Sequence, residues 1–502
     1  MDSTIQTMLD HYCVTPQARE FLAAGHQPMF IDGQFVDASD GGLLSVEDPS
    51  NGAHLMTVPS ATCHDVDLAV AAANRAFHSE AWSGLTPMER QSLLLKLADV
   101  MEAHAQTLAE LESIDAGKAI SGCQVVDVGT SIELIRYMAG WTSKIEGATR
   151  SLSLPGDTMA YTLKEPVGVV GAIVPWNWPL NMSLWKIVAP LVTGCTIVLK
   201  PAELTPMSIL YLMQIWHEAG LPAGVINIVT GTGSLAGQHL VSHPDVQKVS
   251  FTGSTPVGKK VGQAALENLS HVTLELGGKS AMVAFEDAHI EDIVAATHQS
   301  IFFNSGQVCS AGSRLYVQRE LYQATLDALT QSLQEVVLGD PLNPDTTQGP
   351  QISALQLQRI KDYVELGKQE GARLVCGGDC PARPGHYINP TIFADTRNDM
   401  RIVQEEIFGP VLVMQAFDTE EEAIALANDN VYGLAASVFT RDVSRVHRVT
   451  RKLQAGTVFV NTHDAVDVAM PFGGYKQSGI GKDLGPEQLE HYLETKSVII
   501  QL

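Results

Sequence analysis

Apolar residues recur every three to four positions in three segments of the first third of the chain, and this spacing predicts amphipathic helices. The three segments are 65–80, 86–105 and 129–147. Asp65 is placed to cap the first helix. Thr86 and Glu89 form a Ser/Thr-x-x-Glu capping box at the start of the second helix, and Pro87 occupies its first turn.

Short, continuous runs of Val and Ile replace this pattern after residue 165. Such runs predict strands that are buried on both faces. The predicted strands are 167–175, 195–201, 225–231, 246–253 and 272–280. Helical segments follow several of them, beginning near Pro179, at 206–220 and after Ser254. The alternation indicates an α/β fold with a parallel, doubly wound sheet, and a hairpin with an Asp-Gly turn is predicted at 28–48.

Polar or glycine-rich turns follow all five predicted strands, in PWNWPLN, KPAEL, GTGSLAG, FTGS and LELGG. Ligands of doubly wound sheets bind at this edge, beyond the carboxyl ends of the strands. The Rossmann fingerprint is not matched, because three residues instead of two separate Gly233 from Gly237. The spacing of Gly253 and Gly258 fails as well. Each turn could still direct backbone N–H groups at a pyrophosphate, or be an ordinary strand-to-helix turn.

Lys200 and Glu203, in KPAE, give a sharper indication. An acidic side chain at a strand end accepts hydrogen bonds from ribose hydroxyls, and Glu203 would also repel a 2′-phosphate. The pair therefore favours NAD over NADP as the cofactor.

Cys309 lies in FFNSGQVCSAGSR, residues 302–314, among small and polar residues rather than in a regular apolar run. Upstream, the strand 272–280 delivers Glu275 to a Gly-Gly turn. A thiol and a carboxylate on successive turns indicate covalent catalysis with a general base. The alternative is an inert buried thiol, which is what most cysteines are, and a solvated strand end.

The composition is that of a soluble globular protein with two or three domains, since the chain has 502 residues, 45% of them hydrophobic and 18% charged. A formal net charge of -24 disfavours nucleic acid and anionic membranes as partners.

Seven scattered cysteines form no disulfide framework, which fits a reducing cytoplasm. Cys376 and Cys380 have no His or second Cys pair nearby, so no metal site is predicted. The N-terminus lacks the basic region of a secretory signal, and the apolar run 187–199 is too short to span a bilayer.

Seven motifs, taken in order, resemble those of the aldehyde dehydrogenase superfamily. They are PWNWPLN, LKPAE, FTGS, LELGGKS, GQVCSAGSR, EEIFGPV (405–411) and PFGGYKQSGIG (471–481). The resemblance extends from the hairpin to the C-terminus. Within the family it is greatest to the bacterial phenylacetaldehyde dehydrogenases of aromatic catabolism.

The resemblance implies a Rossmann-like NAD-binding domain, an α/β catalytic domain and a small β arm for oligomerisation. The implied ranges are 1–146 and 166–277 for NAD binding, 278–480 for catalysis, and 147–165 with 490–502 for the oligomerisation strands. In the family these strands pair across subunits and close exposed sheet edges. A homo-oligomer is therefore expected, either a dimer or a dimer of dimers.

The resemblance also implies catalytic roles. Cys309 would attack the aldehyde carbon, and the Asn177 side chain would donate to the developing oxyanion beside the backbone N–H of Cys309. After hydride transfer to NAD, Glu275 would activate the water that hydrolyses the thioester. Family members that pass the acyl group to coenzyme A generally lack this glutamate, so hydrolysis to the free acid is expected.

Binding residues are implied in the same way. The implied NAD contacts are Lys200, Glu203, Gly253, Ser254, Trp176, Glu406 and Phe408. The implied aldehyde tunnel is Trp178, Met182, Trp185, Phe303, Val308 and Phe472, although Met182 and Trp178 are equally consistent with core packing. These tunnel positions include no basic partner for a carboxylated semialdehyde and no acidic one for a betaine-type aldehyde. An uncharged aryl or medium-chain alkyl aldehyde therefore fits best, with phenylacetaldehyde as the leading expectation.

Two functions of other classes remain as alternatives. One is a non-catalytic binding protein on the same scaffold, which the presence of Cys309, Glu275 and Asn177 disfavours. The other is an acyltransferase or esterase that uses the thiol without NAD, which the KPAE and EEIFGPV motifs disfavour.

Overall fold

All five predicted buried strands form, and they are adjacent in one sheet of the computed structural model, which describes residues 12–502. The sheet has eight strands in the order β2-β1-β8-β7-β6-β9-β10-β20. Their bounds are β1 Met29–Ile31, β2 Gln34–Val36, β6 Val169–Ile173, β7 Thr196–Lys200, β8 Ile226–Ile228, β9 Lys248–Thr252, β10 His271–Glu275 and β20 Gly479–Ile480. The central five are parallel, whereas β1, β2 and β20 are antiparallel additions at the two edges.

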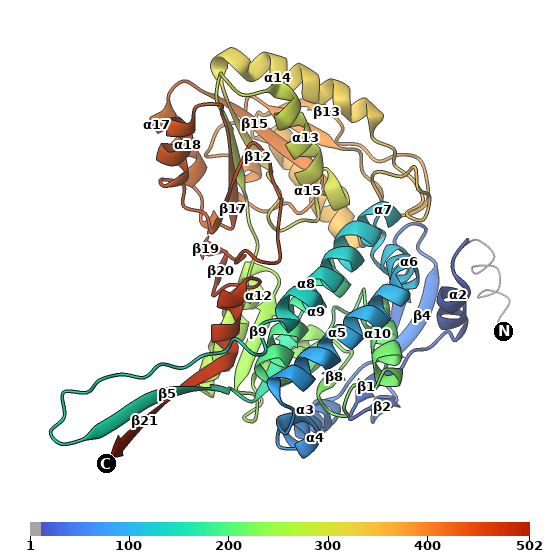
Figure 1. Ribbon diagram of the computed structural model, residues 1–502. Coiled ribbons are helices and arrows are strands. Elements are labelled where there is room, and N and C mark those ends of the chain that lie inside the picture. Colours follow the sequence, from blue (N-terminus) through green and yellow to red (C-terminus); the bar gives the residue numbers. More distant parts are fainter. Residues whose placement is uncertain (1–11) are drawn as a thin grey trace.

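Helices cover both faces of this sheet, as its continuous apolar strands require (Figure 1). Val170 and Leu199 pack into one core with the larger group of helices, while Val169 and Val198 face a second core. The helices of the first core include α5 Pro87–Ala103, α6 Ala105–Ala116, α8 Thr130–Ala139, α9 Pro179–Thr193 and α10 Met207–Glu218. Those of the second include α3 Cys63–Phe77, α11 Gln238–Val241 and α12 Thr255–Glu267. The sheet is therefore doubly wound, as the alternating pattern predicts.

A second sheet of seven strands forms the other lobe, in the order β13-β14-β15-β12-β11-β17-β18. Its strands are β11 Ala281–Ala284, β12 Arg314–Gln318, β13 Arg373–Cys376, β14 Thr391–Ala394, β15 Val411–Phe417, β17 Ala435–Phe439 and β18 Thr457–Val460. All neighbours in it are parallel except β13 and β14. Its helices are α13 Ile290–Ser300, α14 Arg319–Ser332, α15 Ala354–Gln369, α16 Arg401–Gln404, α17 Glu420–Asn428 and α18 Val443–Thr450.

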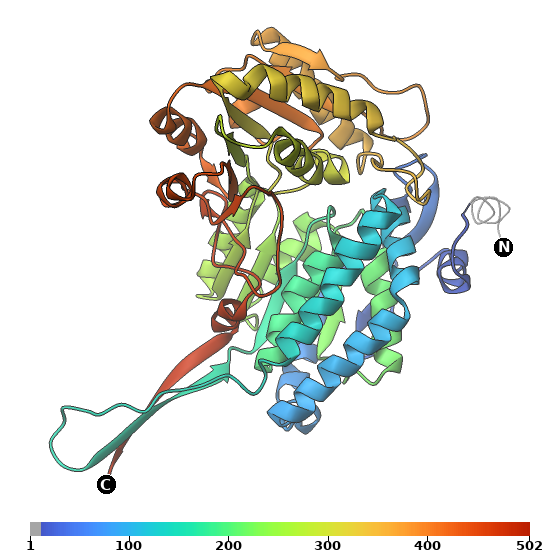
Figure 2. The same ribbon diagram turned by 45° about the horizontal axis from the view of Figure 1, so that its top comes forward.

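Two long strands form an arm that projects from the first lobe (Figure 1, Figure 2). They are β5 Thr158–Pro166 and β21 Leu493–Gln501, and they pair antiparallel over their whole length. Apart from Pro166, both strands fall within the two segments predicted as oligomerisation strands, 147–165 and 490–502. The two strands pair with each other within one chain, and pairing across subunits stays a prediction.

Shorter elements complete the described part of the chain. They are α2 Pro16–Ala23, α4 Glu80–Ser83, α7 Ile120–Gly122, β3 Leu43–Glu47, β4 His54–Pro59, β16 Tyr432–Gly433, β19 Tyr475–Lys476, π-helices at Cys123–Gly129 and Gly233–Gly237, and 3-10 turns at Phe303–Gly306, Leu333–Glu335 and Pro486–Tyr492. None of the helices within residues 12–502 combines the length and the apolar composition needed to cross a membrane. Residues 1–11, which include the predicted start of the NAD-binding domain and the segment examined for a secretory signal, lie outside the described residues.

Three local predictions need correction. Helix α3 begins at Cys63 with Thr62 as its N-cap, and Asp65 is the third helical residue, whose carboxylate accepts from the Thr62 backbone N–H at 2.8 Å. The prediction of Asp65 as the cap was wrong because a capping box places the acid inside the helix. The helix predicted at 129–147 ends at Ala139, and the hairpin near residue 30 ends at Val36. The capping box of Thr86 and Glu89 is confirmed.

Candidate active site

Cys309 lies where two cavities meet, of about 370 Å³ and about 350 Å³. The first extends along α9 and is mainly apolar, and the second follows the carboxyl ends of the strands in the first sheet. The residues that line both are Cys309, Glu275, Trp178, Met182, Thr252 and Leu276. A group bound in either cavity is therefore adjacent to the same thiol and carboxylate.

A left-handed turn precedes Cys309. Asn304, Ser305 and Gly306 have φ values of 45°, 55° and 73° in succession. A Cβ at Gly306 would overlap the backbone of Gly409, so only glycine fits this close approach of two chain segments.

Asn177 is tied to this turn. Its side chain is buried, and its Nδ2 donates to the backbone oxygen of Gln307 at 2.9 Å. In return, Nδ2 of Asn304 donates to the backbone oxygen of Asn177 at 3.1 Å. The loop that follows β6 and the turn that holds Cys309 thus fix each other, and Asn177 lines the strand-end cavity beside the thiol.

Glu275 ends β10 and is only 4% exposed, so the alternative of a solvated strand end is wrong. Neither carboxylate oxygen has a hydrogen-bond partner within the described residues. Burial raises the pKa of Glu275 well above its usual value, and Asp483 adds to the rise, while Lys186 and Lys482 oppose it. Such a group is protonated at a pH where an exposed glutamate is ionised.

Burial also raises the pKa of Cys309 to about 12, and the carboxylates of Asp464, Glu406 and Glu275 add to this rise. The thiol is therefore neutral at pH 7, and attack on a carbonyl requires removal of its proton as the bond forms. The raised pKa of Cys309 therefore favours proton removal during the attack over a preformed thiolate.

All seven predicted NAD contacts line the strand-end cavity. They are Trp176, Lys200, Glu203, Gly253, Ser254, Glu406 and Phe408. At one end, Nζ of Lys200 donates to the backbone oxygens of Pro201 and Gly231, both at 2.8 Å, and lies 3.6 Å from Glu203. Ser254 caps the N-terminus of α12, where a Cβ on Gly253 would lie 2.6 Å from the Phe251 ring.

The other end of this cavity reaches Cys309. Oε1 of Glu406 accepts from the backbone N–H of Gly278 at 3.0 Å, and burial raises the pKa of Glu406 to about 7. Phe408 has a φ of 64° and packs edge-on against Trp176, with ring centroids 5.3 Å apart. The cavity offers carboxylate oxygens that can accept hydrogen bonds from two riboses, a helix N-terminus between them, and aromatic rings near the thiol. This combination of groups fits NAD.

All six predicted aldehyde-tunnel residues line the cavity along α9. They are Trp178, Met182, Trp185, Phe303, Val308 and Phe472. The rings of Trp178 and Phe303 lie 5.8 Å apart, and those of Trp185 and Phe472 lie 5.4 Å apart. Trp178 and Met182 are largely buried as well, so they serve as core and as cavity wall at once.

Among the polar residues of the same cavity that the sequence did not indicate are His463 and Asp464. Nε2 of His463 lies 2.8 Å from the backbone oxygen of Ser310, and its Nδ1 contacts the Ser437 hydroxyl. Both carboxylate oxygens of Asp464 are buried without a hydrogen-bond partner within residues 12–502, and Oδ1 lies 3.7 Å from Nε2 of His463. The six predicted tunnel positions contain no acidic residue, but Asp464 lines the same cavity beside them. The position of His463 and Asp464 directly after the strand that ends at Val460 is the signal that could have found them, because polar residues at strand ends form sites in parallel sheets.

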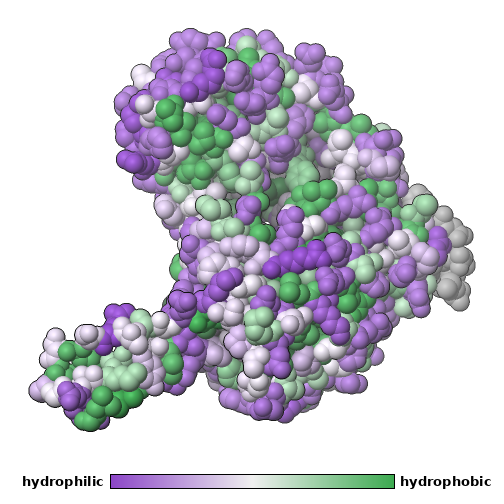
Figure 3. Space-filling view, viewed as in Figure 1, coloured by the Kyte–Doolittle hydropathy of each residue, from purple (hydrophilic) through white to green (hydrophobic). Residues whose placement is uncertain are grey.

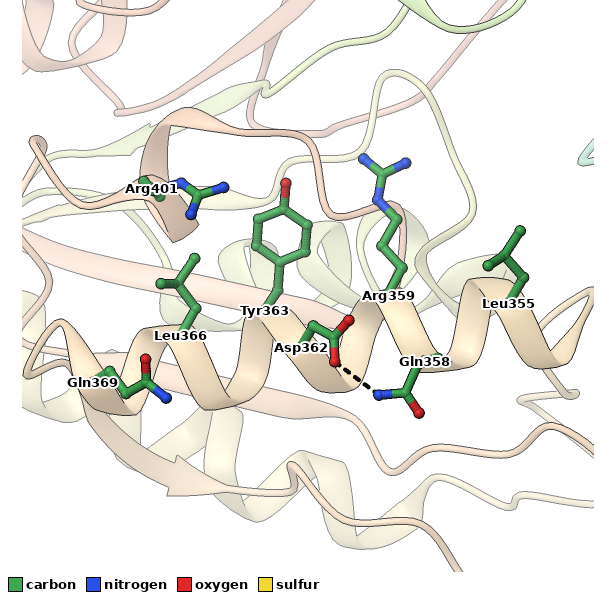
Figure 4. A pocket seen from close by; sticks show the side chains of 8 residues that line it. All are labelled: Leu355, Gln358, Arg359, Asp362, Tyr363, Leu366, Gln369 and Arg401. Atoms are coloured by element: carbon green, nitrogen blue, oxygen red, sulfur yellow. Dashed lines mark hydrogen bonds between the residues drawn. The ribbon is translucent and has the colours of Figure 1, made fainter.

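A separate, shallow depression lies on the surface of α15 (Figure 4). The residues that line it are Leu355, Gln358, Arg359, Asp362, Tyr363, Leu366, Gln369 and Arg401. Nε of Arg401 donates to Oε1 of Glu405 at 2.8 Å, and Nε2 of Gln358 donates to Oδ1 of Asp362 at 2.7 Å. The depression contains no cysteine or unpaired carboxylate, so it is not an alternative to the Cys309 site as an active site. In the described part of the chain, no group of three His, Cys, Asp or Glu residues is placed to hold a metal ion.

Comparison with known proteins agrees with this geometry. Residues 35–498 match the model of the aldehyde dehydrogenase family. An aldehyde dehydrogenase of Emericella nidulans is 47% identical, over 94% of this chain and 95% of its own length. A phenylacetaldehyde dehydrogenase of Pseudomonas fluorescens is 44% identical, over 95% and 96%. The NAD+ complex of an aldehyde dehydrogenase from Bacillus cereus superposes with a TM-score of 0.95 at 46% identity, covering 97% of this chain and 99% of that one.

Proposed function

The chain belongs to the aldehyde dehydrogenase family, whose activity is the NAD-dependent oxidation of aldehydes, and we propose that its substrate is an uncharged aromatic aldehyde of the phenylacetaldehyde type. The observation that supports this proposal is the cavity along α9. Its walls place the paired rings of Trp178 with Phe303, and of Trp185 with Phe472, next to the thiol. Within the described residues no Lys or Arg lines it, so a carboxylated aldehyde would lack a partner.

Each of three residues of the chain has a separate role in this reaction. The sulfur of Cys309 forms a bond to the aldehyde carbon, and the carbonyl electrons move to the oxygen. The thiol proton passes to the ionised form of Glu275, which lines the same cavity and releases the proton to solvent before the hydrolysis step. Asn177 donates to that oxygen, since one amide proton remains beyond its bond to Gln307. NAD, when bound in the strand-end cavity, accepts the hydride. Glu275 removes a proton from the water that hydrolyses the resulting thioester, which frees the acid and restores the thiol.

The resemblance to the Pseudomonas fluorescens enzyme supports the same substrate, because that relative is named for phenylacetaldehyde. A ring of six carbons has the size and shape to lie between the aromatic walls, where offset and edge-on ring contacts are favourable. We therefore expect the protein to prefer this aldehyde over others.

A second candidate substrate is a cationic aldehyde, and Asp464 is the observation that favours it. A buried carboxylate that accepts no hydrogen bond from the described residues is stabilised by a positive charge, and the surrounding aromatic faces also attract cations. The two candidates differ in charge and can be separated directly.

The test is NADH formation, followed by absorbance, with purified protein and a panel of aldehydes. The panel contains phenylacetaldehyde, benzaldehyde, hexanal, succinic semialdehyde and betaine aldehyde, each with NAD and with NADP. We expect the highest kcat/KM with phenylacetaldehyde and NAD. A preference for betaine aldehyde, lost in Asp464→Asn, would establish the second candidate and reject the first.

A further inference from the structure

A buried group of charges lies behind the aldehyde cavity. It consists of Glu112 on α6, Lys118 in the following loop and Asp127 in the π-helix Cys123–Gly129. Their exposed fractions are 0%, 3% and 0%. Nζ of Lys118 donates to Asp127 at 2.5 Å. Because taking charges out of water is costly, a group like this needs compensating contacts on every side.

Lys118 finds one of these contacts on an aromatic face. Its Nζ lies 3.5 Å from the centroid of the Trp178 ring, well within the range of a cation–π interaction, and the pair is shielded from water. The same ring packs on Phe303 and lines both cavities. Trp178 is thus held between a buried cation and another aromatic wall of the aldehyde cavity.

The Lys118 backbone is itself anchored. Its carbonyl oxygen accepts from the Ser113 hydroxyl at 2.6 Å and from the Cys123 thiol at 3.9 Å. The ammonium is consequently presented from a fixed point, and movement of the Trp178 ring away from it would leave the charge with less compensation.

Glu112 holds the first turn of α9, the helix that begins directly after Trp178. Its Oε1 accepts from the backbone N–H of Leu180, two residues after Trp178, at 3.2 Å. Burial and the nearby Asp127 raise the pKa of Glu112, and burial also raises the pKa of Asp127. The two acidic side chains and the amine of Lys118 therefore lie together in one group shielded from water.

We propose that Lys118 is a positioning residue that fixes the plane of the Trp178 indole and so sets the shape of the aldehyde cavity. It touches neither Cys309 nor the strand-end cavity and acts only through Trp178. The inference rests on aldehyde oxidation at this site and not on which aldehyde is preferred. Its consequence is selectivity for large aldehydes over small ones.

The test compares Lys118→Met with the native protein on acetaldehyde and on whichever bulky aldehyde the native protein uses best. We expect kcat/KM for the bulky aldehyde to fall at least tenfold, mainly through KM, and that for acetaldehyde to change by less than threefold. Lys118→Arg, which retains a cation, should restore most of the loss. Lys144→Met is the matched control, because Lys144 also lies over a tryptophan, Trp141, but at 5.4 Å and on the surface.

A double-mutant cycle decides whether the effect passes through Trp178. In a Trp178→Ala background, adding Lys118→Met should cause no further loss of selectivity. If Lys118→Met alone is unstable, Lys118→Met with Asp127→Asn removes both charges and serves in its place. An equal loss with both aldehydes, or a further loss in the Trp178→Ala background, would overturn the inference. If the proposed substrate is wrong, the aldehyde panel measured with the native protein will show this independently of the Lys118 variants.

Discussion

The protonation of single side chains governs the chemistry of this site. Cys309 is a neutral thiol because its surroundings are buried and carry three carboxylates, and Glu275 is protonated well above the usual pH for a glutamate for a similar reason. Each group therefore needs a proton to move during the reaction, and the carboxylates around the thiol control how readily it leaves.

Asp464→Asn should make Cys309 more reactive, because Asp464 is the foremost charge that raises the thiol's pKa. A decrease of about half to one pKa unit would raise the thiolate fraction, and the rate of alkylation by iodoacetamide near pH 8, about three- to tenfold. The measurement is loss of activity with time in iodoacetamide. Asp467→Asn, on the exposed part of the same loop, should leave the rate unchanged. Equal rates in all three proteins would remove Asp464 from the control of the thiol.

Glu275→Gln should separate hydride transfer from hydrolysis. We expect one burst of NADH per active site and then a rate lowered by about a hundredfold or more, because the general base is absent. In the native protein, kcat should fall as the pH falls through the raised pKa of Glu275, since only the ionised form accepts a proton. Stopped-flow absorbance measures the burst, with Glu267→Gln on the exposed end of α12 as control. Normal steady turnover in Glu275→Gln would reject its role as base.

At the scale of elements, the left-handed turn before Cys309 positions the thiol. Its left-handed residues are uncommon outside glycine, and Asn304 tolerates this region better than most residues do. The amide of Asn304 also links the turn to the Asn177 loop. Two irregular loops thereby behave as one rigid support for the thiol and for Asn177, the proposed oxyanion donor.

Asn304→Gly should test this support, because glycine keeps the left-handed backbone and loses only the two hydrogen bonds of the amide. Loss of about 1–2 kcal/mol of positioning energy predicts a five- to thirtyfold lower kcat. Binding of NAD, measured by calorimetry, should stay within twofold. Asn268→Gly removes a comparable bond, to the Ser242 backbone oxygen at 2.8 Å, away from the cavities and should leave kcat unchanged. An unaltered kcat in Asn304→Gly would mean that the backbone alone holds the turn.

At the scale of the whole molecule, the arm of β5 and β21 is the feature that a single chain leaves unexplained. A two-stranded ribbon is marginally stable alone. Hydrophobic side chains are visible on it (Figure 3), and the exposed ones include Met159, Leu163, Ile499 and Ile500. Contact with a second copy of the chain would cover them.

Ile499→Lys combined with Ile500→Lys should therefore reduce the size of the particle in solution. Light scattering after size-exclusion chromatography measures the mass, and we expect a dimer or tetramer to become smaller. Leu266→Lys is the matched control, since Leu266 is 59% exposed on α12 and Ile499 is 61% exposed on the arm. An unchanged mass in the arm variant would reject the role of these residues in assembly.

The sequence by itself determined the strands, the helices between them and the residues that we propose as the reacting groups. Periodicity and turn residues are local properties, so the buried strands, the Thr86 capping box and the cysteine turn could be predicted from neighbouring positions. The resemblance to the family then supplied the two sets of residues that line the cavities.

Only the tertiary structure decided which distant residues surround these groups. Strand β20 pairs with β10 across some two hundred residues and places Gly479 opposite Glu275. In the same way, Asp464 approaches Cys309, and Lys118 lies behind Trp178. The physical reason is that a pattern along the chain encodes which face of an element is buried, whereas the packing of whole elements decides what that face meets.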